Sequence, residues 1–208
     1  MGIVWVIGAP AWDRVIRLDA HPVRGGFARG RLAAERPGGG AANVARALAS
    51  AGHRVLLIGR VGDDERGRAL RAELAGWGVD VSGLAVGPAP TAESFVWLDP
   101  EGESTVVSLE PSPVEADPDA FHNGPPPDAV FAAWFGPGVR RELARLRDAG
   151  VRVAVPWPPP GTPPVAAELL FVSEPLLPGP ARSDPVRAAR AATGGAVRWV
   201  VVSRGPRG

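Results

Sequence analysis

The hydrophobic pattern of this chain alternates between short, continuous apolar runs and longer amphipathic segments. The apolar runs predict buried strands. The segments between them predict helices, because their apolar residues recur at i, i+3, i+4 and i+7. The expected strands are 3–7, 55–58, 129–134, 151–155, 169–172 and 199–202. The expected helices are 41–51, 64–77, 138–149 and one that begins at the favourable capping pair Asp184-Pro185. Apolar strands between helices indicate an α/β fold with a largely parallel sheet covered on both faces.

Two segments, at about 14–35 and 91–108, follow a different pattern. Apolar and polar residues alternate there with a period of two, which is typical of half-exposed strands. The second segment contains an expected hairpin at 94–107, whose turn is Asp99-Pro100-Glu101-Gly102. We predict that both segments form one small layer of exposed antiparallel strands that projects from the main sheet. Phe95 and Trp97 should face a partner or a ligand.

Composition and charge exclude several classes of protein. The chain has 208 residues, of which 45% are hydrophobic and 22% charged, enough for one globular domain with a sizeable core. All 23 basic residues are Arg, the formal net charge is only +1, and the arginines are interspersed with acidic residues. This pattern predicts solvated helix faces and no nucleic-acid partner. The chain has no Cys, which rules out disulfides and thiolate metal sites. Its beginning shows neither a leader nor a membrane span, so we expect no membrane partner and a cytoplasmic location.

A glycine run stands directly before the first expected helix, in the segment Gly38-Gly39-Gly40-Ala41-Ala42-Asn43. Backbone without side chains at a helix N-terminus offers free N–H groups and the positive end of the helix dipole. Such a site suits hydroxyl or phosphate oxygens of a small ligand. The alternative interpretation is a glycine-rich turn before an ordinary amphipathic helix.

Further blocks follow the glycine run in a fixed order. They are Gly59-Arg60-Val61-Gly62-Asp63-Asp64-Glu65-Arg66-Gly67, Gly78-Val79-Asp80-Val81-Ser82-Gly83 and Pro90-Thr91-Ala92. Over residues 1 to about 108 this ordered set resembles the ribokinase-like (PfkB) carbohydrate kinases. The resemblance implies a ribokinase-like fold with a mostly parallel sheet, helices on both faces and a small β lid over a sugar site. It also implies a single domain, 1–208, that is incomplete at its C-terminal end.

The acidic residues of the block 59–67 are expected to have a structural role. Asp63 or Asp64 should cap the helix that follows, and Gly67 should allow close packing against the sheet. Two adjacent aspartates beside Glu65 are more typical of a solvated first turn than of a metal site. We therefore predict no metal ligand here.

The family activity is ATP-dependent phosphorylation of a sugar or related polyol hydroxyl, which implies ATP and Mg as cofactors. The resemblance assigns substrate binding to Asp13, Gly38, Gly39 and Asn43. A carboxylate accepts hydrogen bonds from neighbouring sugar hydroxyls, glycine allows close approach, and Asn both donates and accepts. The alternatives are a simple loop or capping role for Asp13 and a capping role for Asn43. Ribokinase has an Asn where this chain has Ala11, so ribose is not assumed as the substrate.

The catalytic machinery of the family has no match in these residues. Its catalytic Asp lies in a late D-T-x-G-A-G-D segment, whereas this sequence ends on a segment that resembles the strand before it. The N-x-x-E motif associated with Mg and phosphate corresponds to Ser173-Glu174-Pro175-Leu176. We name no catalytic residue and expect negligible turnover from the 208-residue chain. Two interpretations stay open: a carbohydrate kinase that is inactive as this truncated chain, or a catalytically silent pseudokinase that binds a small polyol or serves in assembly. The expected partners are a small sugar or polyol and a second copy joined through the lid.

Overall fold

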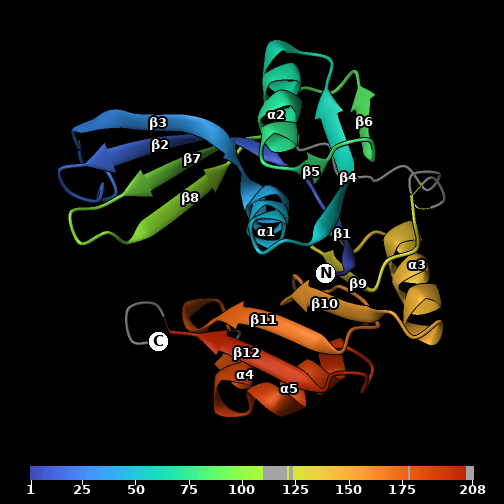
Figure 1. Cartoon of the computed structure of the whole chain (residues 1–208). Helices are drawn as coiled ribbons and strands as arrows, with labels where there is room; N and C mark the ends of the chain where they lie inside the picture. Colours follow the sequence, from blue (N-terminus) through green and yellow to red (C-terminus); the bar gives the residue numbers. More distant parts are fainter. Residues whose placement is uncertain (110–120, 122–123, 178, 205–208) are drawn as a thin grey trace.

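The computed structural model describes residues 1–109, 121, 124–177 and 179–204, and its core is a parallel sheet (Figure 1). The strand order is β12-β11-β10-β9-β1-β4-β5, and β6 pairs with the far part of β4. Every pairing in this sheet is parallel. The strands are β1 (Ile3–Ile7), β4 (Arg54–Gly62), β5 (Val79–Asp80), β6 (Leu84–Gly87), β9 (Ala129–Ala132), β10 (Arg152–Pro156), β11 (Leu169–Ser173) and β12 (Trp199–Ser203). All the strands expected from apolar runs are therefore confirmed, and β5 and β6 are additional.

Helices cover both faces of the sheet, as the continuous apolar strands predict. Helices α1 (Gly39–Ser50) and α2 (Glu65–Gly76) pack on one face, and α3 (Pro137–Asp148) and α5 (Pro185–Ala192) on the other. Alternate residues of β1 separate the two cores: Val4 and Val6 face α1 and α2, whereas Trp5 and Ile7 face α3 and α5. A 3-10 turn (Glu174–Leu176) and the short helix α4 (Gly179–Ser183) follow β11.

The sheet is not covered equally along its length. In β11 and β12 three large apolar side chains that face away from α3 and α5 are exposed. Phe171 is 37% exposed, Val201 45% and Trp199 70%. Parallel strands are normally buried on both faces, so this part of the α/β layer has one uncovered face among the described residues.

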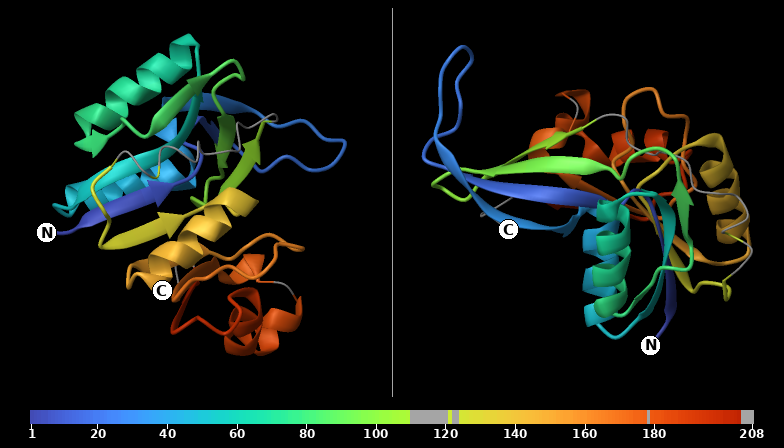
Figure 2. Two further views of the ribbon diagram at one scale, coloured as in Figure 1. Left: turned by 90° about the vertical axis from the view of Figure 1, so that its right-hand side faces the viewer. Right: turned by 90° about the horizontal axis from the view of Figure 1, so that it is seen from above.

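The two alternating segments form one separate sheet, as predicted, with the order β3-β2-β7-β8. Its strands are β2 (Ala11–Leu18), β3 (Gly30–Gly38), β7 (Glu93–Leu98) and β8 (Ser104–Ser108). We call this sheet the lid; Figure 2 shows it projecting from one end of the molecule. The β7–β8 hairpin turns where expected, with Gly102 at φ +87° and its N–H 3.1 Å from the Asp99 carbonyl oxygen.

The expectation of a purely antiparallel lid is wrong, because β2 and β7 run parallel. Both strands start beside the carboxyl ends of main-sheet strands and run outward in the same direction. Their starting points are joined by the N–H of Trp12, which donates to the carbonyl of Ala92 at 2.8 Å. The lid is therefore a mixed sheet made of two hairpin-like arms held side by side.

The described helices are short. None of them combines the length and the apolar character that crossing a bilayer requires.

Candidate functional site

Asp13 lies at the root of the lid and is buried there, with 8% of its surface exposed. A simple loop position was the alternative for this residue, but β2 begins at Ala11, so Asp13 is the third residue of a strand. It is paired with Arg36 of β3 on one side and with Ser94 of β7 on the other. Paired residues in neighbouring strands place their side chains on the same face of a sheet. Asp13, Arg36 and Ser94 therefore share one face of the lid.

The glycines before α1 lie directly against this carboxylate. A Cβ atom added at Gly38 would sit 1.8 Å from Asp13 Oδ2, so only glycine leaves room for the side chain. Gly39 has a φ of +77° and opens the helix, two residues earlier than the sequence pattern indicated. The structure therefore brings Asp13 together with Gly38 and Gly39 at the N-terminus of α1. We call Asp13, Arg36, Gly38, Gly39 and Ser94 the β2–α1 site.

The Asp13 carboxyl group is held in an environment that disfavours its charge. Burial raises its pKa, although the Gly39 N–H, the Ser94 hydroxyl and the positive charge of Arg36 each act to lower it. Its Oδ1 atom is buried and has no hydrogen-bond partner within the described part of the chain. A buried acceptor without a donor costs free energy, so this oxygen is suited to a donor supplied by a ligand.

Asn43 is one helical turn beyond Gly39. Its side chain is exposed, and it does not cap the helix, because the N-cap residue is Gly38 and no side chain bonds to the cap. Residues i and i+4 share a helix face, so Asn43 lies above Gly39 on the same side of α1. The capping alternative for Asn43 is therefore wrong, and its ligand role stays a prediction.

Phe95 and Trp97 point away from this site. They alternate with Ser94 along β7, so they lie on the lid face opposite Asp13. Arg14, which is on that other face, places its guanidinium 6.0 Å from the centre of the Phe95 ring. The expectation that these two aromatic residues meet a ligand held by Asp13 is not met by this geometry.

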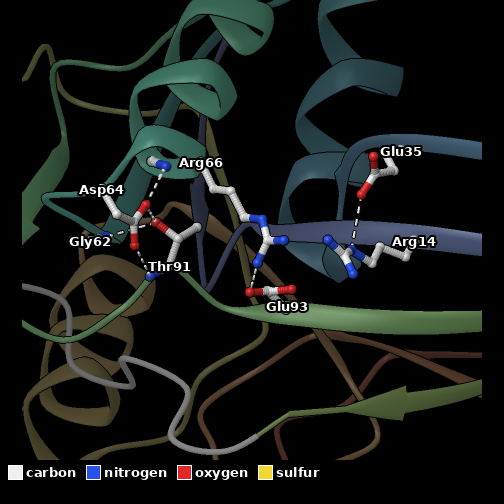
Figure 3. Close-up of polar contacts among 8 residues, drawn as sticks. Arg14, Glu35, Gly62, Asp64, Arg66, Thr91 and Glu93 are labelled. Carbon is white, nitrogen blue, oxygen red and sulfur yellow. Dashed lines mark hydrogen bonds and ion pairs between the residues drawn. The ribbon is translucent and has the colours of Figure 1, made fainter.

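A second polar cluster joins α2 to the start of β7 (Figure 3). Asp64 caps α2 by accepting from the Gly67 N–H at 2.7 Å, and it also accepts from the N–H and hydroxyl of Thr91 at 2.8 and 2.7 Å. The Thr91 hydroxyl oxygen in turn accepts from the N–H of Gly62 at 3.0 Å. Burial opposes ionisation of Asp64, but these hydrogen bonds outweigh it and lower its pKa. The expected capping role of this acidic pair is confirmed for Asp64, and Thr91 is a partner that the sequence did not indicate.

The same junction carries ion pairs. Arg66 of α2 pairs with Glu93 at the start of β7, and Arg14 Nε lies 2.9 Å from Glu35 Oε1 across β2 and β3 (Figure 3). Arg68 also lies 3.3 Å from Asp63, but both side chains are largely exposed. The first pair joins α2 to β7, and the second neutralises Arg14 on the lid face opposite Asp13.

A cavity of about 430 Å³ lies at the carboxyl ends of β10, β11 and β12. In parallel α/β sheets, ligands bind at this edge. Its walls are mainly apolar, and hydroxyls are contributed by Ser173 and Ser203. The lining residues are Pro156, Trp157, Pro158, Pro159, Pro160, Phe171, Val172, Ser173, Leu176, Val201 and Ser203. Among the described residues, its lining contains no charged side chain.

The described residues offer no grouping of three or more His, Asp or Glu side chains that could hold a metal ion. Glu174, the nearest acidic residue to the N-x-x-E position, has its Oε1 3.9 Å from Arg204 Nε. These residues do not fit the Mg that the family resemblance implies.

Comparison with known proteins places this geometry in a family. The model of the pfkB family of carbohydrate kinases matches residues 4–127. The chain is 35% identical over 150 residues to the ATP-dependent ribose-1-phosphate kinase of Halopiger xanaduensis, covering 69% of this chain and 50% of that protein. It thus spans about half the length of that relative.

Solved structures show the same fold at lower identity. Ribokinase from Thermotoga maritima superposes with a TM-score of 0.73 at 17% identity, over 100% of this chain and 73% of that one. Arabidopsis thaliana ribokinase complexed with ribose and ATP gives 0.66 at 20% identity, over 96% and 70%. From the match to its family model, this chain belongs to the pfkB family of carbohydrate kinases.

Proposed function

We propose that the β2–α1 site binds the acceptor of an ATP-dependent phosphoryl transfer to a sugar or related polyol hydroxyl. The observation that carries the proposal is the Asp13 carboxylate, buried against Gly38, with Oδ1 lacking a donor. A sugar hydroxyl supplies that donor, and neighbouring hydroxyls reach the free N–H groups at the start of α1. Asn43 on the same helix face gives a further donor and acceptor.

Asp13 has a positioning role in this proposal. It is fixed by its strand neighbours on both sides and by the glycines, so a hydroxyl bonded to it is held in one orientation. Phosphoryl transfer depends mainly on positioning and on charge stabilisation, so an oriented acceptor is a large part of what the protein supplies. No residue of the described chain is assigned as the catalytic base.

The cavity at the ends of β10, β11 and β12 is the candidate place for the phosphate donor. Its apolar walls, including Trp157, suit the base of a nucleotide. Ser173 and Ser203 give this cavity its hydroxyl groups, and the described residues form no site for Mg. ATP supplies the transferred phosphoryl group when it is bound.

The second candidate function is a catalytically silent sugar-binding protein. It is favoured by Ser173 and Leu176, which replace the polar residues of N-x-x-E, and by the lack of charged side chains among the described residues that line the cavity. Phosphates are normally bound by cations and by clusters of N–H donors. A chain with this lining binds the acceptor more readily than it transfers a phosphoryl group to it.

Two measurements test these functions. Calorimetric titration of the purified 208-residue chain with ribose and fructose should show binding that Asp13→Asn weakens at least about tenfold, because a hydrogen bond to a charged group is lost. Asp63→Asn, an exposed carboxylate outside the site, is the matched control. Equal affinities for the two variants would rule out the proposed acceptor site.

A coupled ADP-release assay with the same sugars separates the two candidates. Loss of a general base alone commonly lowers rates about 10²- to 10⁴-fold, so we expect binding without measurable turnover from these 208 residues. Sugar-dependent ADP release at a rate typical of kinases would instead assign the catalytic base to residues within this chain.

A further inference from the structure

Arg36 is a cation beside Asp13 on the same face of the lid. The two residues are paired across β2 and β3, and the charge of Arg36 acts on the pKa of Asp13. Side chains paired in this way have Cβ atoms about 5 Å apart. The guanidinium is exposed, and it makes no ion pair or hydrogen bond with another described residue.

Three other arginines, Arg14, Arg46 and Arg66, differ from Arg36 in this respect. Arg14 pairs with Glu35, and Arg66 pairs with Glu93. Arg46 of α1 stacks on Trp77, with 4.6 Å between its guanidinium carbon and the ring centre. Arg36 thus keeps its charge available on the face that carries Asp13 and the start of α1.

Two positive groups therefore flank the buried carboxylate: the Arg36 guanidinium and the N-terminal end of α1, a helix of 12 residues. Asp13 Oδ1 can accept a hydrogen bond from one hydroxyl of the ligand. The positive potential of Arg36 and of the α1 N-terminus favours a negatively charged group on the same ligand. A neutral sugar uses only the first of these features. A sugar that carries an anionic group close to its hydroxyls uses both.

We propose that the acceptor of the β2–α1 site is an anionic sugar, either a sugar phosphate or a sugar acid, and that Arg36 binds its anionic group. This inference rests on the proposed function, because it presupposes that Asp13 holds an acceptor hydroxyl. Arginine forms two parallel hydrogen bonds with phosphate or carboxylate, so it fixes the orientation of the ligand as well as adding affinity. Arg36 is thereby a specificity-determining residue: neutral sugars bind through Asp13, the start of α1 and Asn43, and they gain nothing from Arg36.

The test is calorimetric titration of the 208-residue chain with ribose, ribose 1-phosphate, ribose 5-phosphate and gluconate. The variants are Arg36→Gln, Arg36→Lys and the matched control Arg31→Gln, which lies farther out on the same strand. We expect at least one anionic sugar to bind about 10- to 100-fold more tightly than ribose, which is the contribution of a charge-assisted pair. Arg36→Gln should remove that difference, Arg36→Lys should restore part of it, and Arg31→Gln should leave it unchanged.

Salt dependence provides a readout that a merely structural role would not change. The preference for the anionic sugar should shrink between 50 and 500 mM KCl in the wild type, and Arg36→Gln should abolish this dependence. In Arg36→Gln the affinity for the anionic sugar should fall by more than the affinity for ribose, whereas Arg31→Gln should leave both affinities and the melting temperature as in the wild type.

The outcomes separate this inference from the function beneath it. If ribose binds as tightly as every anionic sugar, or if Arg36→Gln keeps the preference, the inference is overturned while the acceptor site stands. If phosphates alone or gluconate alone show the preference, the inference is supported and the class of anion is fixed. If no sugar binds, or if Asp13→Asn binds all of them as the wild type does, the proposed function itself fails, and this inference with it.

Discussion

Replacing Gly38 by alanine should disrupt the β2–α1 site more than any other single methyl group added to the glycine run. The new Cβ atom would lie 1.8 Å from Asp13 Oδ2 and 2.2 Å from its Cγ, where ordinary contacts begin at 3.4 Å. The atoms it meets belong to a short side chain that is itself buried between two strands. Asp13 therefore has to rotate out of its position, or the junction of β3 with α1 has to open.

The expected cost follows from this overlap. Overpacking a well-packed site typically costs about 1–3 kcal/mol of unfolding free energy, and we place Gly38→Ala at the upper end of this range. Sugar affinity should fall by at least about tenfold, because the carboxylate that accepts the hydroxyl is displaced. Urea unfolding gives the first quantity and calorimetric titration the second.

Gly40→Ala is the matched control. An added Cβ at Gly40 meets no other atom within 4 Å, and the residue lies inside α1. Alanine is a better helix former than glycine, so this variant should gain up to about 1 kcal/mol of unfolding free energy and keep its sugar affinity. Equal urea midpoints and equal affinities for Gly38→Ala and Gly40→Ala would show that Asp13 does not rest on Gly38, and the site as described would be wrong.

Other predictions concern the junction, the buried charge and the uncovered sheet face. Asp64→Ala should lower the unfolding free energy by about 2–4 kcal/mol in urea, because a helix cap and two bonds to Thr91 are lost, whereas Asp63→Ala should change it by less than about 0.5 kcal/mol. Folding lowers the pKa of Asp64, so its ionised carboxylate stabilises the folded protein fully above about pH 4. This stabilisation is lost as the pH falls through the pKa of the folded state. The difference in unfolding free energy between the wild type and Asp64→Ala should therefore vanish in acid. Folding raises the pKa of Asp13, so its negative charge destabilises the folded protein once the pH rises through the pKa of the folded state. Asp13→Asn should therefore match or exceed the wild-type melting temperature at pH 7. A clearly lower melting temperature for Asp13→Asn at pH 7 would contradict this reasoning. Trp199→Glu should reduce binding of a hydrophobic dye to the exposed face of β12, and no reduction would show that the dye binds elsewhere.

Most of the main sheet could be predicted from the sequence because its strands are buried on both faces. Continuous apolar runs separated by amphipathic helices leave few alternatives, and β1, β4 and β9–β12 all appear where those runs stand. Strands β5 and β6 gave no such signal. They have two and four residues and lie in a segment rich in glycine, which is typical of a turn.

The site was only partly predictable, because its important contacts join residues distant in the chain. The glycine run indicated a ligand-binding turn, and the resemblance added Asp13, but neither gave the pairing of Asp13 with Ser94 across 81 positions of sequence. Asp64 was expected to cap a helix, whereas its bonds to Thr91 depend on where β7 begins. Arg36 carried no signal at all, since one arginine among 23 is distinguished only by its pairing with Asp13 across β2 and β3, which the fold reveals.

The arrangement of the lid makes acceptor binding and lid position parts of one structural unit. Asp13, Arg36 and Ser94 come from three adjacent lid strands, whereas Gly39 opens a helix packed on the main sheet. A ligand held between Asp13 and the start of α1 therefore bridges the lid and the main body at the point where β3 runs into α1. The bonds of Asp64 to Thr91 tie the same lid to α2 from the other side. A substitution in that second cluster should consequently alter sugar affinity without touching the sugar, because it changes how firmly β7 presents Ser94 to Asp13.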